Sequence, residues 1–244
     1  KKRGVFWKTL RVRTIKKKTM KNFTKLFMIA IAMTMATNGL YAQKIGIKAG
    51  FNLSNMLIED EDEIYSNDFK MKPGFHLGAI VDIPLNDMFS IETGLLLSTK
   101  GFKLSEEETE MGETFKYEFK YNLIYLDIPL TAKASFNVGD AKIYGAFGPY
   151  IGIGLSGTVK SELSFAGETE SNSEIIDWGS DENNDELKRL DYGLTMGVGV
   201  EINSIQIGIT YGLGLANISP YVEYDSKINN RVLGISVGYF FGGN

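Results

Sequence analysis

The sequence predicts an all-β protein, namely an eight-stranded antiparallel up-and-down transmembrane β-barrel preceded by an N-terminal signal peptide. Three observations predict it: an export signal, eight segments in which apolar residues alternate with small or polar ones, and connections that alternate between short and long. Alternation with period two puts apolar side chains on one face of a strand. In an outer-membrane barrel that face meets lipid, and the small, polar face lines the lumen.

The N-terminal part of the chain is expected to be absent from the mature protein. Residues 20–43 have the features of a signal peptide: lysines follow Met20, an apolar run covers residues 26–36, and a small residue, Ala42, stands just before the expected cut. The apolar run is too short to span a bilayer as a helix. Residues 1–19 form a strongly basic extension. One interpretation is a tail that binds nucleic acid or anionic lipid. We favour the other interpretation, in which these residues are upstream sequence from a start codon placed too early or an extended n-region of the signal.

The remaining residues, 44–244, form the predicted barrel domain and are strongly acidic. Of the 26 basic and 30 acidic residues in the chain, 11 basic residues and none of the acidic ones precede position 44. The barrel domain therefore has a formal net charge of −15. The chain contains no cysteine, which excludes a disulfide, a thiolate metal site and a cysteine nucleophile.

The first four expected strands each show the alternation. In residues 44–56 and 71–84 the apolar side chains fall on odd positions, beginning with Ile45 and Phe75. Residues 89–102 follow a four-residue turn, and residues 116–136 end at the Asn-Val-Gly-Asp turn that begins at position 137. Glycine and asparagine in such short links are typical of hairpins.

The other four expected strands continue the pattern. Residues 142–158 contain five glycines, and residues 188–202, which end at the Asn203-Ser204 turn, have glycines only at odd positions. Residues 205–217 alternate Ile, Tyr and Leu with Gln, Gly and Thr. The last strand, 231–241, ends in aromatic residues. The recurring glycines do not indicate a nucleotide loop, because that loop needs a turn into a helix.

The lengths of the connections predict the orientation of the barrel. Links after the second, fourth and sixth strands are tight, whereas the others are long and acidic or polar, including acidic loops at 59–63 and 106–110 and a long loop at 159–186. Bacterial outer-membrane barrels have short periplasmic turns and longer external loops. Aromatic residues near strand ends agree with an interfacial girdle. These residues are Phe51, Phe75, Phe89, Tyr211, Tyr239 and Phe241.

Three stretches carry a resemblance to a known family. They are Gly46–Ser54 (GIKAGFNLS), Tyr125–Leu130 (YLDIPL) with Lys133 after it, and Gly145–Gly152 (GAFGPYIG). The chain resembles the PorT-like outer-membrane β-barrel family of Gram-negative bacteria (outer membrane protein beta-barrel domain) over essentially all of residues 44–244. The resemblance implies the barrel fold and, from the family's namesake, a part in a protein-secretion system. It implies no catalytic residues.

Charged side chains on inward positions predict a polar network that fills the lumen. An eight-stranded barrel has room inside for side chains or one small ligand, and buried charges are costly unless they pair. We expect Lys48 and Lys133 to pair with Asp82, Glu92, Asp127 and Glu201; a proton or ion path along these groups is the alternative. The inward charged residues are Lys48, Asp82, Glu92, Lys100, Asp127, Lys133, Asp191 and Glu201.

Other candidate sites receive little support from the sequence. His76 is the single histidine, on the inward face of the second strand, and no serine and acid stand with it at loop tips as a nucleophile and base would require. Acidic residues of the long loop contain oxygen ligands suited to Ca²⁺ but lack the spacing of a calcium loop, so we expect a solvated surface. They are Asp177, Asp181, Glu182, Asp185 and Glu186. We therefore expect no catalytic residue, metal or cofactor.

Together these features predict a non-enzymatic scaffold in the cell outer membrane, with acidic external loops that contact partners. The expected partners are outer-membrane lipid and lipopolysaccharide, with secretion-system proteins as a further group and no nucleic acid. An accessory component of a protein-secretion system is the first alternative. A lipid-modifying barrel enzyme is the second alternative, and the residues give it little support.

Overall fold

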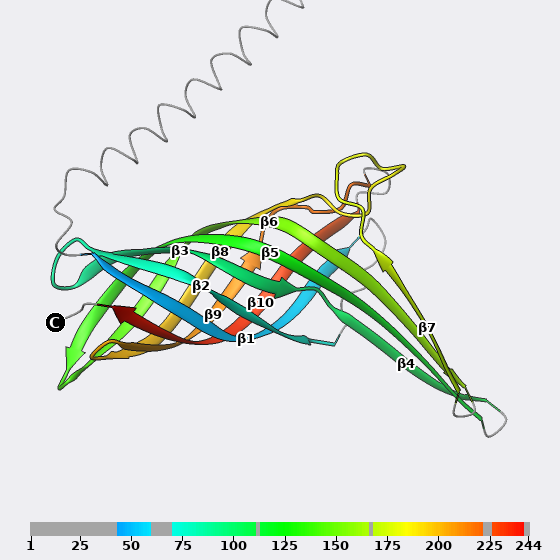
Figure 1. Ribbon diagram of the computed structural model, residues 1–244, viewed down its shortest axis with the longest axis horizontal. Coiled ribbons are helices and arrows are strands. Elements are labelled where there is room, and N and C mark those ends of the chain that lie inside the picture. Colours follow the sequence, from blue (N-terminus) through cyan, green and yellow to red (C-terminus); the bar gives the residue numbers. More distant parts are fainter. Residues whose placement is uncertain (1–42, 60–69, 111–112, 166–167, 222–225, 242–244) are drawn as a thin grey trace, which may run out of the picture. The chain divides into compact units, whose positions relative to one another are not determined.

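The computed structural model describes residues 43–59, 70–110, 113–165, 168–221 and 226–241. The basic extension and the signal peptide lie outside the described residues. Within them, no helix is long and apolar enough to cross a membrane. Figure 1 shows the ten strands. They are β1 (Lys44–Glu59), β2 (Lys72–Pro84), β3 (Phe89–Lys100), β4 (Lys103–Glu110), β5 (Glu113–Val138), β6 (Ala141–Phe165), β7 (Glu168–Ile175), β8 (Leu190–Ile202), β9 (Ile205–Gly214) and β10 (Lys227–Phe241).

Eight of these strands form a closed ring in which each pairs antiparallel with its neighbours. The order is β1-β2-β3-β5-β6-β8-β9-β10, and β10 pairs with β1 from Ile45↔Phe241 to Glu59↔Lys227. Every connection within the ring links strands that are adjacent in it. Closure pairs the edge strands with each other. The predicted eight-stranded up-and-down barrel is confirmed.

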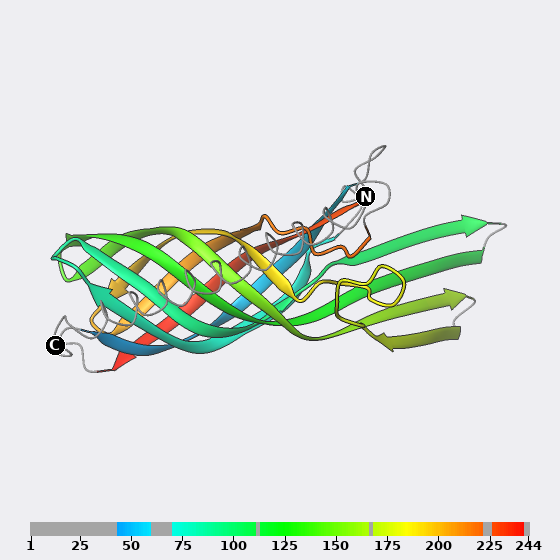
Figure 2. The same cartoon turned by 90° about the horizontal axis from the view of Figure 1, so that it is seen from above.

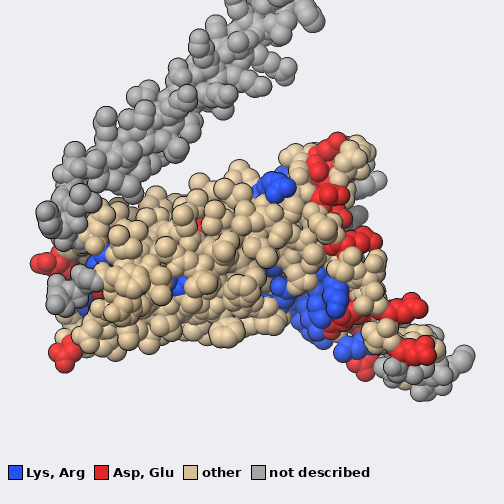
Figure 3. Space-filling model, in the orientation of Figure 1, with Lys and Arg blue, Asp and Glu red and all other residues tan. Residues whose placement is uncertain are grey.

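The exterior of the barrel is apolar and its interior is polar, as the alternation predicted. Along β1, the odd-numbered Ile45 and Ile47 are about half exposed, whereas the even-numbered Lys48, Asn52 and Ser54 are buried. Figure 3 shows the barrel wall as a broad surface with few charged atoms, with charged groups gathered towards its ends. A continuous apolar surface of this kind is a liability in water, so we assign it to contact with lipid.

Three tight links join strands at one end of the barrel. They cover residues 85–88, 139–140 and 203–204. Asn203 has a φ of 54° and Gly139 a φ of 62°, values in the left-handed region that two-residue hairpin turns require. Phe89, Tyr239 and Phe241 lie exposed near this end, as an interfacial girdle would place them. Because short links mark the periplasmic side of such barrels, this end is the periplasmic one.

At the opposite, external end the structure differs from the expected loops. Residues 106–110 belong to β4, and much of 159–186 belongs to β6 and β7. We call β4, residues 113–121 of β5, residues 158–165 of β6, and β7 the arm. Figures 1 and 2 show its four strands side by side, continuing beyond the barrel wall. The arm exists because β5 and β6 stay paired as far as Phe115↔Phe165 and each folds back on a further strand.

A β-bulge marks the place where the arm leaves the barrel. Opposite Ile124 and Tyr125 on β5, the register of β6 shifts by one residue at Leu155. Leu155 and Ser156 are consequently both exposed, although they are sequence neighbours on one strand. An extra residue reverses the direction of every later side chain on its strand. Beyond the bulge, odd-numbered residues of β6 therefore share a face with odd-numbered residues of β5.

Candidate functional site

A cluster of charged side chains crosses the lumen near the periplasmic end, and we call it the basal cluster. Lys133 forms an ion pair with Asp82 and lies 3.6 Å from carboxylate oxygens of both Glu92 and Glu201. Lys48 pairs with Glu92, which also accepts a hydrogen bond from Gln206. Lys44 pairs with Glu201. Three lysines thus balance three carboxylates, drawn from β1, β2, β3, β5 and β8.

A second cluster, the outer cluster, lies closer to the external end. Lys100 Nζ is 2.8 Å from Asp127 Oδ1 and 3.0 Å from Asp191 Oδ2. Tyr150 and Asn230 donate hydrogen bonds to Asp191. The lysine Nζ also lies 4.6 Å and 4.7 Å from the ring centroids of Tyr125 and Tyr150, where cation–π attraction adds to the ion pairs. The cluster has two carboxylates and one lysine.

The structure brings the eight expected lumen residues inside the barrel but divides them between these two clusters. Asp127 was expected near Lys48 or Lys133, and it lies instead with Lys100. The reason is their position along the barrel. Asp127 and Lys133 are six residues apart on β5, a distance of about 20 Å along the strand. Sequence alternation gives the face of a residue, whereas pairing across the lumen also depends on height.

Between the clusters lies a cavity of about 130 Å³. Its lining includes charged groups of both clusters together with His76, Asn52 and Thr131. His76 Nδ1 lies 2.7 Å from Asn52 Oδ1, and the Asn52 amide donates to Ser98 Oγ at 3.0 Å. The His76 ring is thus held by the Asn52 amide, and Ser98, its register partner on β3, is bonded to the same amide. Its environment is that of a hydrogen-bonded filler.

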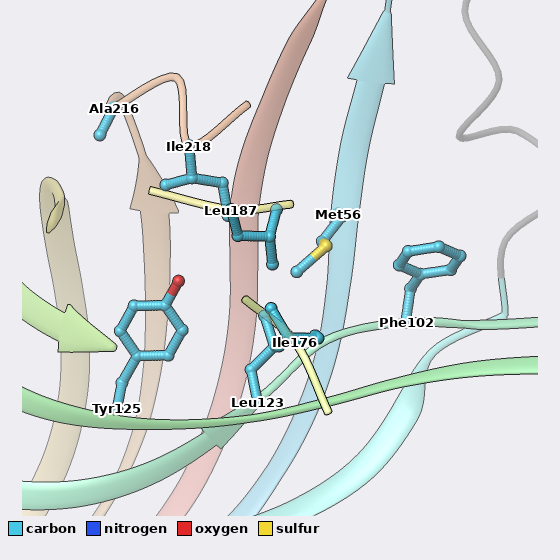
Figure 4. Close-up of a cluster of buried hydrophobic side chains, with 8 residues drawn as sticks. All are labelled: Met56, Phe102, Leu123, Tyr125, Ile176, Leu187, Ala216 and Ile218. Atoms are coloured by element: carbon cyan, nitrogen blue, oxygen red, sulfur yellow. The ribbon is translucent and has the colours of Figure 1, made fainter. Parts of the chain in front are cut away.

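A hydrophobic cap closes the external mouth of the barrel above the outer cluster. It is built from strand ends and from the connections after β7 and β9, and Figure 4 shows its side chains converging. Backbone hydrogen bonds fasten the connections: Gly154 N donates to Arg189 O, and Lys188 N to Ile218 O. The buried members of the cap are Met56, Phe102, Leu123, Tyr125, Ile176, Leu187, Ala216 and Ile218.

Two glycines on the inner face of β6 make room for the cap. The ring of Trp178 packs edge-on against Tyr125 at 5.7 Å between centroids and lies against the backbone of Gly154. A Cβ on Gly157 would stand 2.8 Å from Leu123 and 2.9 Å from Ile176, closer than packed carbon atoms approach. Gly154, on the inward face of the expected strand, was a sequence signal for this cap, although the apolar residues that the connections contribute to it, Ile176, Leu187 and Ile218, show no periodicity.

The acidic side chains of the connection after β7 accept hydrogen bonds from groups within the same connection. Asp181 accepts hydrogen bonds from the backbone N of Asn183 and the amide of Asn184, and Asp185 accepts one from Asp181 N. Among the residues that the structure describes, no group of three or more His, Asp or Glu side chains could hold a metal ion. This connection is a self-bonded loop beside the cap.

The arm has a different electrostatic character on each face. On one face, Glu118 forms ion pairs with both Lys103 and Lys120. Hydrogen bonds from these two lysines lower the pKa of Glu118 to about 2. Glu162, on the next strand, pairs with Lys120 and Lys160. This face, which we call the paired face, carries a ladder of alternating charges across β4, β5 and β6.

Comparison with known proteins agrees with this architecture. A family model described as "Outer membrane protein beta-barrel domain" matches residues 41–220. The chain belongs to this family. The protein is therefore an outer-membrane β-barrel, with its apolar exterior in the lipid of that membrane. No curated protein matches the chain.

Several solved small outer-membrane barrels are similar to this outer-membrane barrel. Ail of Yersinia pestis is 18% identical, with 81% of this chain and 99% of Ail covered and a TM-score of 0.32. Neisserial surface protein A is 11% identical (80% and 97% covered, TM-score 0.36). OprG of Pseudomonas aeruginosa is 14% identical (83% and 98% covered, TM-score 0.41). At these values the likeness carries no argument about a ligand or an activity.

When the purified protein is reconstituted in planar bilayers, we expect no large steady conductance at neutral pH. The basal cluster, the outer cluster and the cap each cross the lumen, which leaves no continuous aqueous path of porin width. Single-channel recording measures this. Detergent without protein and a sixteen-stranded porin are the two controls, and steady openings comparable with those of the porin would contradict a filled lumen.

Proposed function

We propose that this outer-membrane barrel is a non-enzymatic scaffold that contacts partner proteins outside the cell through its acidic external arm and loops. The observation that carries the proposal is the contrast between the two ends of the molecule. Beneath the cap, the lumen is occupied by paired charges, so it offers little room for transport. On the external side, four strands extend beyond the membrane-spanning wall and present half-exposed aromatic side chains.

The arm is suited to this role because a rigid sheet holds its side chains in place. β5 and β6 run without interruption from the periplasmic turn into the arm. Binding surfaces placed on strands of a scaffold are held more accurately than those on free loops. The lipid-modifying alternative finds less support, since His76 is bonded to Asn52 inside the lumen rather than placed at a lipid-facing opening.

A role as an accessory component of a protein-secretion system is the second candidate, supported by the resemblance to the PorT-like family. Both candidate functions use the arm as a contact surface, but they predict different effects of deleting the gene. A secretion component predicts that deletion of the gene traps cargo proteins in the periplasm. Normal export from the deletion strain rejects that candidate and leaves the scaffold.

Photo-crosslinking in living cells tests the scaffold directly. A photoreactive phenylalanine analogue at Tyr117, on the arm, is expected to form covalent adducts with another protein, because that side chain is exposed outside the membrane. The same analogue at Ile209, in the middle of the lipid-facing wall, is the matched control and is expected to give none. Adducts are measured by gel shift and mass spectrometry. Absence of protein adducts at Tyr117, Leu163 and Phe165 alike would overturn the proposal.

A trimmed arm provides a functional readout. Replacing residues 106–117 and 163–170 each by Asn-Gly keeps the barrel and joins strands by turns of the hairpin type. The trimmed barrel is expected to reach the outer membrane but to fail to complement a deletion strain. Full complementation by the trimmed barrel would contradict a contact role for the arm.

A further inference from the structure

The face of the arm opposite the paired face carries a row of aromatic and aliphatic side chains, and we call it the aromatic face. Phe115, Tyr117, Phe119 and Tyr121 are alternate residues of β5 and therefore point the same way. Phe115 pairs in register with Phe165, and Tyr117 with Leu163. The rings of Phe115 and Phe165 stack at 4.4 Å between centroids. The bulge at Leu155 is what brings the β6 residues to this face.

The row is covered at its base and uncovered towards its tip. Phe119 and Tyr121 pack against the cap, where Phe102 stacks on Tyr121 at 5.0 Å. Phe115, Tyr117, Phe165 and Leu163 are 38–47% exposed. The aromatic face thus continues the apolar packing of the cap outward, onto a surface that nothing in the described chain covers. A row of stacked, exposed rings is a common core of protein-binding surfaces.

Glutamates border the row on both outer strands. Glu106 on β4 is in register with Tyr117, while Glu170 and Glu168 on β7 are in register with Leu163 and Phe165. The aromatic face contains no lysine or arginine at the described positions of the four strands. Among the residues that the structure describes, these three glutamates form no ion pair. Their negative charge is therefore free to meet a cation from outside, unlike that of Glu118 and Glu162 on the paired face.

We propose that the aromatic face docks an extended, positively charged segment of a partner protein, with Lys or Arg side chains alternating with apolar ones. Apolar side chains of such a segment cover the aromatic row, and its cationic ones reach the glutamates and the ring faces. Charge complementarity selects this occupant. A second copy that presents its own aromatic face brings the same glutamates and is repelled, as are the phosphates of lipopolysaccharide. This inference rests on the proposed function and adds the site and the chemistry of the partner.

A peptide-binding measurement tests the inference on the full barrel in lipid nanodiscs. The probe is a fluorescent nine-residue peptide in which Lys alternates with Leu and Tyr, and its counterpart has Glu in place of each Lys. We expect the Lys peptide to bind at least tenfold more tightly than the Glu peptide, by fluorescence anisotropy at low salt. Raising the salt to 0.5 M should weaken binding, since exposed charges are screened.

Two matched pairs of variants locate the site. Glu170→Gln removes a charge from the aromatic face and is expected to weaken binding several-fold, whereas Glu107→Gln removes one from the opposite face and is expected to change it by less than twofold. Tyr117→Ser should weaken binding tenfold or more, with Lys116→Ser, its neighbour on the paired face, as control. The gel mobility of unheated samples verifies that each variant is folded.

Each outcome decides the inference. Equal binding of the Glu peptide, equal effects of Glu170→Gln and Glu107→Gln, or binding of lipopolysaccharide vesicles in place of the Lys peptide would overturn it. If the Lys peptide fails to bind while Tyr117 crosslinks a protein in cells, the scaffold stands and the partner chemistry proposed here is wrong. If crosslinking at the arm fails as well, the proposed function falls with it.

Discussion

Replacing Lys100 by Met is expected to lower the free energy of unfolding of the barrel by about 3–5 kcal/mol. The lysine side chain is 2% exposed and is the cation nearest to both Asp127 and Asp191. Met fills nearly the same space between the rings of Tyr125 and Tyr150 but carries no charge. Two carboxylates then remain in the lumen without a counterion. Urea titration in lipid vesicles, followed by the gel mobility of the folded barrel, measures the change.

Lys103→Met is the matched control, because Lys103 also pairs with a carboxylate but lies on the arm. Its side chain is 29% exposed and is not enclosed in the lumen, so its loss should cost about 1 kcal/mol or less. The triple variant K100M/D127N/D191N should regain much of the lost stability, since it removes the uncompensated charges as well. Equal effects of Lys100→Met and Lys103→Met would contradict the outer cluster as a buried network.

Replacing Ile209 by Arg is expected to cost about 2–4 kcal/mol in folding into a bilayer. Ile209 lies at the middle of β9, between Val198 on β8 and Ile235 on β10, and its side chain points outward. An arginine there must place its charge in hydrocarbon. Folding efficiency and unfolding midpoint in vesicles of defined lipid measure the cost.

Ile202→Arg, at the last residue of β8 beside the periplasmic turn, provides the comparison. It lies on the same outward face but near the membrane boundary, where an arginine costs only about 0–1 kcal/mol. A depth-dependent difference between the two variants is therefore the expected result. Similar small costs at both positions would mean that the outward face does not lie in hydrocarbon.

The closed ring could be predicted from the sequence because lipid and lumen impose opposite demands on neighbouring residues. Ile45 and Lys48 illustrate this: the side of the wall on which each lies follows from whether its position is odd or even. The short turns followed from asparagine and glycine at positions 203 and 139. All of this information is local, so a single sequence contains it.

The arm could not be predicted, because its strands depend on pairing between distant residues. The consecutive acids from Glu106 to Glu108 break the alternation and suggested a loop. They form a strand because β5 is long enough to pair with them. The bulge at Leu155 was equally hidden, since inserting one residue changes the faces of Leu163 and Phe165 without altering the local composition.

The cap and the pairing of the lumen charges needed three-dimensional information of another kind. Ile176, Leu187 and Ile218 are scattered apolar residues in largely polar connections, and they follow no common periodicity. For the charges, the pattern identified the inward side chains but not their height along the barrel, which decided that Asp127 meets Lys100. Glycines opposite large side chains, such as Gly154 opposite Trp178, were the clue to where segments approach closely.

The unbroken course of β5 has a mechanical consequence. Its 26 residues extend over about 85 Å, several times the height of the apolar band of such a barrel, about 25 Å. A force applied at the tip acts along the strands and loads many ladder hydrogen bonds at once in shear, instead of opening them one after another. A cell surface held by this protein would therefore resist pulling through the same backbone that anchors it in the membrane.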